Sequence, residues 1–225
     1  MLKPKTKRIS KQELKEDKFV KTTLQVKSYM EENYRQVITV VGTFFAILVL
    51  FILYNYVQQE TRAEANAIFG MAQIEFTNGE YAKASLKLTK LINEYDGTVE
   101  AEQGLFLLAN INFQQKRYDE AEKYFDQFID SYSGSDILIG SAYAGLAACK
   151  ETHNKYEEAA DLYVSAADMA PDFTESDNYI YLAGICYKKA GKIENAVKQF
   201  KNLTERETAS KLQKDAEVQL ALLKQ

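Results

Sequence analysis

The residues that most often carry chemistry in proteins are scarce in this chain. Its 225 residues include one histidine, His153, and two cysteines, Cys149 and Cys186. A protein metal site needs three or four suitable ligands held together, and the sequence has no cluster of ligand residues at such a spacing. Motifs for a phosphate-binding loop and for a nucleophile elbow are also missing from it. We therefore expect a protein that is not an enzyme and that uses no cofactor and no metal.

These three residues have simpler structural interpretations. His153 falls in a predicted turn, where we expect it to be exposed to solvent. Cys149 and Cys186 occupy equivalent places in two neighbouring repeats, described below. Stacked helices lie about 8–10 Å apart, whereas a disulfide requires Cα atoms within about 7 Å. The sequence therefore predicts two free, packed thiols.

The strongest feature near the N-terminus is an apolar run at residues 37–57, which reads VITVVGTFFAILVLFILYNYV. A helix of this length reaches about 31 Å, close to the hydrocarbon thickness of a bilayer. No charged residue occurs between Arg35 and Glu60, and tyrosines stand at both ends, where interfacial aromatic residues are common. The run predicts a membrane-spanning helix at 36–59. A cleaved signal is the alternative, because small residues follow the run.

Charge predicts the orientation of this span. Residues 1–35 carry ten Lys or Arg against five Asp or Glu, and the rest of the chain carries a net charge of −9. Positive residues flanking a span usually stay in the cytoplasm. We expect a basic cytoplasmic tail at 1–35 and an extracytoplasmic domain at 60–225. In a bacterium this is a single-pass inner (plasma) membrane protein with its domain in the periplasm. The tail is either a weak interfacial helix on the lipid bilayer or a mobile segment. The acidic outer domain argues against nucleic acid as a partner.

Four stretches beyond the span resemble one another: GEYAKASLKL, KRYDEAEKYF, NKYEEAADLY and GKIENAVKQF. In each, a large residue is followed after three positions by alanine and after four more by a second large residue. These anchors are Tyr81, Ala84 and Leu88; Tyr118, Ala121 and Phe125; Tyr156, Ala159 and Tyr163; and Ile193, Ala196 and Phe200. The first anchors lie 37, 38 and 37 positions apart, a period that indicates stacked structural repeats.

A small residue lies nine positions before each first anchor, at Ala72, Ala109, Ala147 and Gly184. A small side chain there lets two helices approach closely, so each repeat is predicted to be a helix pair. This pattern resembles the tetratricopeptide repeat, with a helix A, a turn at Gly79, Lys116, Asn154 or Gly191, and a helix B. The expected fold class is all-α. One transmembrane helix leads into an α-solenoid of about four helix pairs, and the segment ASKLQKDAEVQLALLKQ forms a C-terminal capping helix.

The resemblance also implies a partner-binding groove, because the A helices line the concave face in tetratricopeptide proteins. Carried onto this chain, the positions are Phe69, Gln73, Phe76, Phe106, Leu107, Asn110, Phe113, Tyr181, Leu182 and Ile185. They give an apolar, aromatic wall with amides, which is either an open groove or a surface covered by the cap or the stalk helix. The Lys and Asn clamp of members that bind chaperone tails is replaced here by Phe69, Gln73, Leu107, Ser141 and Gly145. Capture of an acidic C-terminus is therefore disfavoured.

Two features concern the apolar helix itself. Gly42 and Ala46 form a small-xxx-small pair, which can seat another membrane helix. No glycine or proline lies between Gly42 and Gly70, so the helix is expected to continue into helix A of the first repeat.

The whole architecture resembles the YfgM-like ancillary subunits of the SecYEG translocon. This resemblance implies a non-catalytic helper whose partners are the translocon, periplasmic chaperones or emerging chains. An alternative is a permanent subunit or assembly scaffold of another inner-membrane complex. A third hypothesis, an import receptor of a eukaryotic outer membrane, is disfavoured by the missing clamp.

Overall fold

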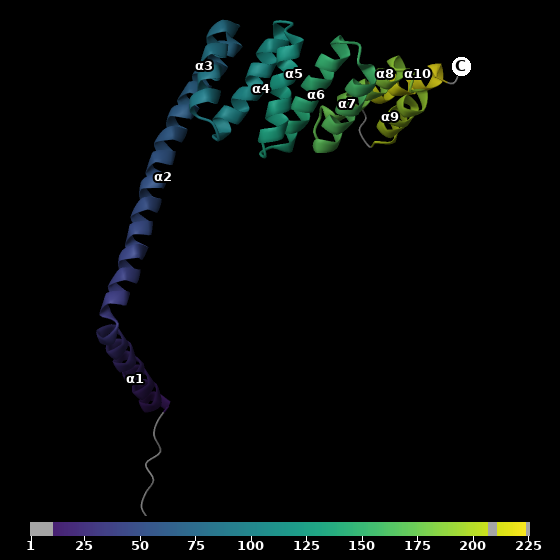
Figure 1. Cartoon of the computed structure of the whole chain (residues 1–225). Helices are drawn as coiled ribbons and strands as arrows, with labels where there is room; N and C mark the ends of the chain where they lie inside the picture. The colour runs from purple at the N-terminus through teal and green to yellow at the C-terminus, as the bar shows by residue number, and fades with distance from the viewer. Residues whose placement is uncertain (1–10, 207–210, 224–225) are drawn as a thin grey trace, which may run out of the picture. The chain divides into compact units, whose positions relative to one another are not determined.

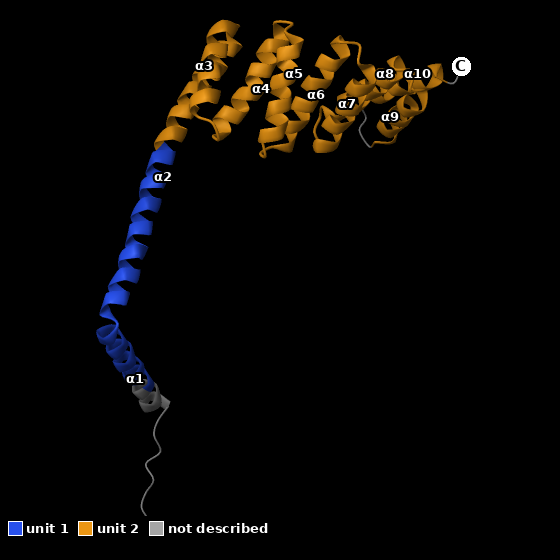
Figure 2. Cartoon of the chain, in the orientation of Figure 1, with its two compact units in different colours: residues 1–59 blue, residues 60–225 orange. Residues whose placement is uncertain are grey.

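The computed structural model describes residues 11–206 and 211–223. The first ten residues of the predicted basic tail lie outside the described part. The chain divides into two compact units, residues 1–59 and residues 60–225 (Figure 2). Within the described residues all regular structure is helical, as the sequence predicted, and Figure 1 labels the ten helices in chain order.

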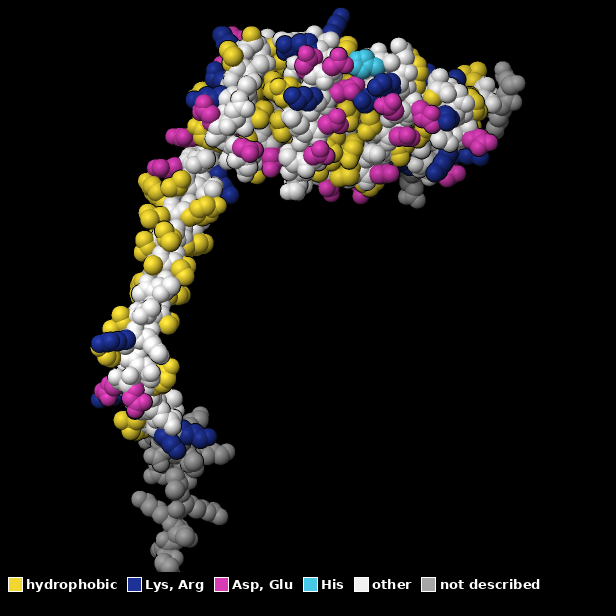
Figure 3. All heavy atoms as spheres, in the orientation of Figure 1, with side chains coloured by type: hydrophobic (Ala, Val, Ile, Leu, Met, Phe, Trp, Pro, Cys, Tyr) yellow, Lys and Arg dark blue, Asp and Glu magenta, His cyan; other side chains and the backbone are white. Residues whose placement is uncertain are grey.

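The first unit contains α1 (Lys11–Glu32) and the first part of α2 (Tyr34–Thr77). Helix α2 runs without interruption through Gly42 and Gly70, which confirms the expected continuity. By length and composition alone, α2 could cross a membrane. Its large apolar side chains from Ile38 to Val57 are exposed, and hydrophobic atoms gather along this part of the helix in Figure 3.

The second unit is a row of helix pairs. Residues 60–77 of α2 pair with α3 (Tyr81–Glu94), and α4 (Val99–Gln114) pairs with α5 (Tyr118–Ser131). The third pair is α6 (Asp136–Thr152) with α7 (Tyr156–Met169), and the fourth is α8 (Ser176–Lys189) with α9 (Ile193–Glu205). Helix α10 (Lys211–Leu222) follows and packs against α9. We call the first helix of each pair its A helix and the second its B helix.

The predicted small residues lie at the contacts within these pairs. Ala72, Ala109 and Ala147 are fully buried, and so are the four alanines of the B helices: Ala84, Ala121, Ala159 and Ala196. At Gly184, a Cβ atom would lie 2.5 Å from the ring of Phe200 on the paired helix α9. The glycine is therefore required by close packing of the fourth pair.

All four A-to-B turns have the same backbone. Gly79, Lys116, Asn154 and Gly191 have positive φ angles of 76°, 59°, 60° and 74°. In each turn, the N–H of this residue donates to the carbonyl three positions earlier, and the next N–H donates to the carbonyl five positions before it. This is the hydrogen-bond pattern of a Schellman helix end, which satisfies carbonyls that the helix itself leaves free.

Helix α10 has the register of an A helix. Ala216, Leu220 and Leu223 each lie 37 positions after a residue of α8, namely Tyr179, Ala183 and Cys186. Ala216 is fully buried, and both leucines pack against the core cluster that holds Ala183 and Cys186. The predicted cap is thus the first half of a fifth repeat. Its outer side is less polar than expected, because Val218 and Leu222 are more than half exposed.

Candidate partner-binding surface

The aromatic residues predicted to line the groove lie on the A helices and pack largely against their own B helices. The ring of Phe106 lies 5.9 Å from that of Phe125 and 5.3 Å from that of Phe128. Phe76 contacts Tyr81 and Phe113 contacts Tyr118, with ring centroids 5.7 and 5.4 Å apart. These distances are typical of favourable aromatic pairs. The three phenylalanines are half-buried, so they expose one side and hold the pair together with the other.

The other predicted positions differ in exposure along the solenoid. Phe69 is buried, Gln73 is exposed, and Leu107 and Asn110 are half-buried. At the C-terminal end, the half-buried residues Tyr181, Leu182 and Ile185 share a cluster with leucines of α10. Helix α10 contacts both α9 and α8 at that end of the solenoid.

Four polar residues at equivalent positions of the A helices form a row. Three of them lie three positions before the predicted groove residues Phe69, Phe106 and Tyr181, and the fourth, Ser141, lies three positions before Ala144. Asn66, Gln103, Ser141 and Asn178 lie 37, 38 and 37 positions apart, and each is exposed or half-buried. Gln73 and Asn110 lie one helical turn after Phe69 and Phe106, on the same two A helices. Side-chain amides and hydroxyls both donate and accept hydrogen bonds, and none of these six residues carries a charge. The A-helix face is thus a surface of amides beside half-exposed aromatic rings.

The small pair proposed for membrane-helix contact lies in the first unit. Both Gly42 and Ala46 are exposed, and a Cβ atom added at Gly42 would meet nothing within 4 Å. This part of α2 therefore has room for another helix at the pair.

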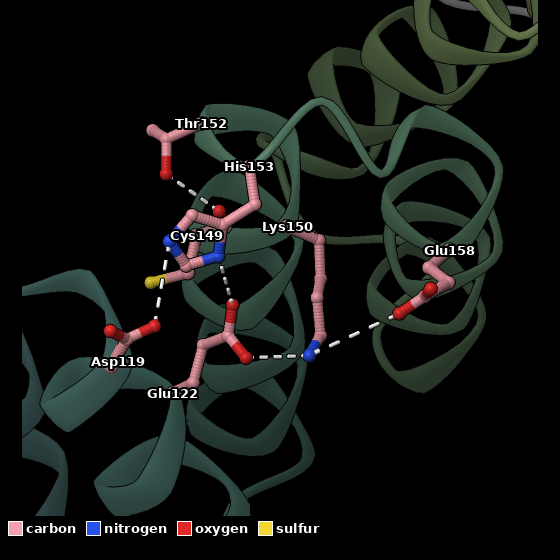
Figure 4. A network of polar contacts seen from close by, with 7 residues as sticks. All are labelled: Asp119, Glu122, Cys149, Lys150, Thr152, His153 and Glu158. Atoms are coloured by element: carbon pink, nitrogen blue, oxygen red, sulfur yellow. Dashed lines mark hydrogen bonds and ion pairs between the residues drawn. The ribbon is translucent and has the colours of Figure 1, made fainter.

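Side chains of the second and third repeats form a polar network that the sequence pattern did not predict (Figure 4). Lys150 Nζ lies 2.5 Å from Glu122 Oε2 and 4.0 Å from a carboxylate oxygen of Glu158. His153 Nδ1 lies 3.0 Å from the other oxygen of Glu122, and its Nε2 lies 3.5 Å from Asp119. His153 is exposed in the turn after α6, as predicted. Its contacts with α5 depend on how two repeats stack, which a linear pattern does not show.

The two cysteines are free and buried, as the sequence predicted. Burial raises the pKa of the Cys149 thiol to about 12, and nearby Glu122 acts in the same direction. Burial likewise raises the pKa of Cys186 to about 12, with Glu151 adding to the effect. Since the thiolate is the nucleophile and the metal ligand, both groups are poorly suited to either chemistry. Within the described residues, no group of three His, Cys, Asp or Glu is placed to hold a metal ion.

Solved structures with the same helical arrangement share little sequence with this chain. The crystal structure of the MamA protein matches with a TM-score of 0.53 and 19% identity, over 63% of this chain and 72% of that one. A putative kinesin light chain from Podosopora anserina, with nearly identical TPR-like repeats, matches with a TM-score of 0.56 and 12% identity. That match covers 72% of this chain and 86% of the other. These likenesses show the fold.

Sequence comparisons agree with the fold. A TPR repeat-containing protein of Methanocaldococcus jannaschii is 32% identical over 99 residues, which cover 44% of this chain but only 30% of the archaeal protein. The model of the tetratricopeptide repeat-like domain matches residues 27–225. The chain therefore belongs to the tetratricopeptide repeat-like domain family, whose fold typically serves as a protein-interaction scaffold.

Proposed function

We propose that this protein is a non-catalytic, membrane-anchored module that holds an extended segment of a partner protein along its A helices. The observation that carries the proposal is the uncharged row of Asn66, Gln103, Ser141 and Asn178 beside half-exposed aromatic rings. An extended peptide presents backbone N–H and C=O groups at every residue, and amide side chains can pair with both. Binding of this kind depends on backbone groups more than on the charge of the partner.

The membrane anchor in this proposal is the apolar part of α2. Its support is an apolar helix of sufficient length, flanked by a tail with ten Lys or Arg. With positive residues retained in the cytoplasm, the repeat unit stands on the extracytoplasmic side. A fusion of alkaline phosphatase to residue 225 should then be active in a bacterial host, while the same fusion at residue 30 should be inactive. The reverse result would contradict the proposed topology.

Partner identity is proposed from architecture. A single N-terminal span followed by a tetratricopeptide unit fits an adaptor beside the translocon that holds periplasmic chaperones or emerging chains. The alternative is a scaffold subunit of another membrane complex. A helix of that complex would pack against the small pair Gly42 and Ala46. Stoichiometry separates the two. A scaffold co-purifies through detergent at a fixed ratio, whereas an adaptor is recovered in substoichiometric amounts.

The test of the binding surface is photocrosslinking in the membrane. A photoreactive residue is placed at Gln73, which is exposed, and at Asn110, which is half-buried on the next A helix. The matched control is Lys123, an exposed residue of the B helix α5. Adducts with protein partners at positions 73 and 110, absent at 123, would support the proposal. Equal adducts at all three positions would contradict it.

A further inference from the structure

The three internal junctions between repeats are built from the same positions. The residues of an A helix that face the preceding B helix lie fourteen, ten and seven positions before the first anchor of its repeat. In α4 these are Gly104, Leu108 and Ile111, and in α6 they are Ala142, Leu146 and Cys149, all of them buried. A Cβ atom at Gly104 would lie 3.3–3.7 Å from Leu91, Leu88 and Ile92 of α3. The preceding B helix therefore covers this face in the interior of the solenoid.

The first repeat exposes the same face. Its equivalent positions are Ala67, Met71 and Ile74 on α2, and we call them the edge face. Met71 is 53% exposed and Ile74 is 63% exposed, whereas Leu108 and Ile111 at the equivalent positions of α4 are 4% and 0% exposed. The residues are apolar like their buried counterparts, yet among the described residues no B helix covers them. Large apolar side chains that are exposed here, at positions buried in the other repeats, indicate a surface that binds a partner.

The carboxylate of Glu75, beside the edge face, indicates which kind of side chain the partner carries there. Six residues before the anchor, two of the three internal A helices reach back to the preceding B helix, since Lys150 pairs with Glu122 and the Tyr187 hydroxyl donates to Asp161. In α4 the residue at this position is Asn112, whose amide donates to the Leu108 carbonyl of its own helix. The first repeat has Glu75 at this position, with its side chain only 16% exposed. One oxygen of Glu75 accepts from Lys87 at 2.5 Å, and the other is buried and accepts no hydrogen bond from the described residues. A basic group on the partner would complement this carboxylate.

We propose that the edge face binds an amphipathic helix of a partner protein, which takes the place of a preceding B helix. The internal B helices define its pattern. In α3, the residues that contact the next A helix are Leu88, Leu91 and Ile92. The position that pairs with the row of Glu75 is taken from α5, where Glu122 lies three residues before Phe125, the equivalent of Leu88. In α7, Asp161 pairs with the same row two residues before Tyr163. The partner helix thus carries a basic residue, then large apolar residues three, six and seven positions later. This site lies apart from the amide row and does not depend on the function proposed for it.

A peptide taken from the chain itself can serve as the probe. Residues 116–132 contain α5, whose Phe125, Phe128 and Ile129 have the required spacing. One labelled peptide has the natural sequence, with Glu122 at the charged position, and the other carries Glu122→Lys. Both are titrated by fluorescence anisotropy against the full chain in detergent micelles. We expect the Glu122→Lys peptide to bind about tenfold more tightly, the scale of one hydrogen bond between charged groups.

Variants of the full chain locate the site. Met71→Glu with Ile74→Glu should weaken binding of the Glu122→Lys peptide at least tenfold, and Glu75→Gln should make the two peptides bind equally. Leu86→Glu is the matched control, because Leu86 is a 75% exposed leucine of the same repeat outside the edge face.

Three results would overturn the proposal. The first is that neither peptide binds, and the second is that binding survives the double substitution. The third is a dimer of the full chain in sedimentation that Met71→Glu converts to a monomer, because the edge face would then be occupied by a second copy.

Discussion

Lys150 joins helix α6 to helix α5 of the preceding repeat, with its Nζ atom 2.5 Å from Oε2 of Glu122 (Figure 4). The two side chains are only 18% and 16% exposed, so solvent screens their attraction less than at an open surface. The hydrogen bond with Glu122 raises the pKa of Lys150 above its ordinary value. Lys150 also lies 4.0 Å from Glu158 of α7, so one ammonium group connects three helices of two repeats.

Replacement of this ammonium should destabilise the repeat unit. Lys150→Met keeps the aliphatic stem but leaves the carboxylate of Glu122 without its cation, which should cost about 1–3 kcal/mol of unfolding free energy. Urea denaturation followed by circular dichroism at pH 7 measures the change. Lys123→Met, at an exposed position of α5, is the control and should stay within about 0.5 kcal/mol of the wild type. Equal effects of the two substitutions would show that the Lys150 contact contributes nothing.

The same pair predicts a pH dependence. A lysine whose pKa is raised on folding contributes stability that is fully present below the pKa of the unfolded chain, near 10.5. That contribution is lost as the pH rises through the higher pKa of the folded state. The stability difference between the wild type and Lys150→Met should therefore be constant from pH 7 to 9 and shrink above about pH 10.5. Denaturation curves of both proteins at pH 7, 9 and 11 test this. A difference that grows with pH would refute the assignment.

Overpacking tests the register of the repeats. Ala121 is fully buried between the helices of the second pair, so Ala121→Leu should force α4 and α5 apart and cost about 1–3 kcal/mol. Ala82 on α3 is exposed, and Ala82→Leu provides the matched control with an expected change near zero. Thermal unfolding of both variants gives the comparison. An unchanged melting temperature for Ala121→Leu would mean that the helix pairs are packed in another register.

The repeat itself could be predicted from the sequence because its determinants are local. A small residue, a turn residue and an alanine recur at a fixed spacing, and each acts through contacts within one helix pair. The turn positions show this well, since Gly79, Lys116, Asn154 and Gly191 share one backbone although only two are glycine. Spacing identified Lys116 and Asn154 where residue type alone would not.

Contacts between repeats could not be predicted in the same way. Glu122 and His153 lie 31 positions apart, and their meeting depends on the rotation of one pair against the next. The inward packing of Phe106 on Phe125 and Phe128 was missed for a similar reason, because a position that borders a groove can also border the core. Substitution of Phe106 by a charged residue would therefore disturb folding as well as binding. Gln73 and Asn110 are better probes of the surface.

The shared turn geometry leads to a further prediction. Gly191 has a φ angle of 74°, which costs a residue with a Cβ atom about 1–2 kcal/mol. Gly191→Ala should lower the unfolding free energy by about this amount, although a Cβ atom there would meet nothing within 4 Å. Lys116→Gly is the reciprocal variant, which relieves the same backbone cost at φ 59° and should not destabilise the protein. A Gly191→Ala variant as stable as the wild type would contradict the backbone cost. A loss of stability in Lys116→Gly would mean that side-chain contacts of Lys116 outweigh that cost in its turn.

The thiols give the last prediction. Cys149 and Cys186 are both fully buried, and burial raises the pKa of each to about 12, so at pH 8 the nucleophilic thiolate is a very small fraction of either group. Ellman's reagent should therefore modify neither cysteine in the native full chain within minutes, and both after unfolding in urea. Non-reducing electrophoresis after mild oxidation should show no new intramolecular or intermolecular disulfide.

The control is Ser141→Cys in a Cys149→Ala and Cys186→Ala background, which places one thiol at a half-exposed position of the A-helix face. It should react under native conditions. Rapid native reaction of Cys149 or Cys186 would mean that the third and fourth pairs open on the time scale of the labelling, and that their packing is looser than the burial of these residues indicates.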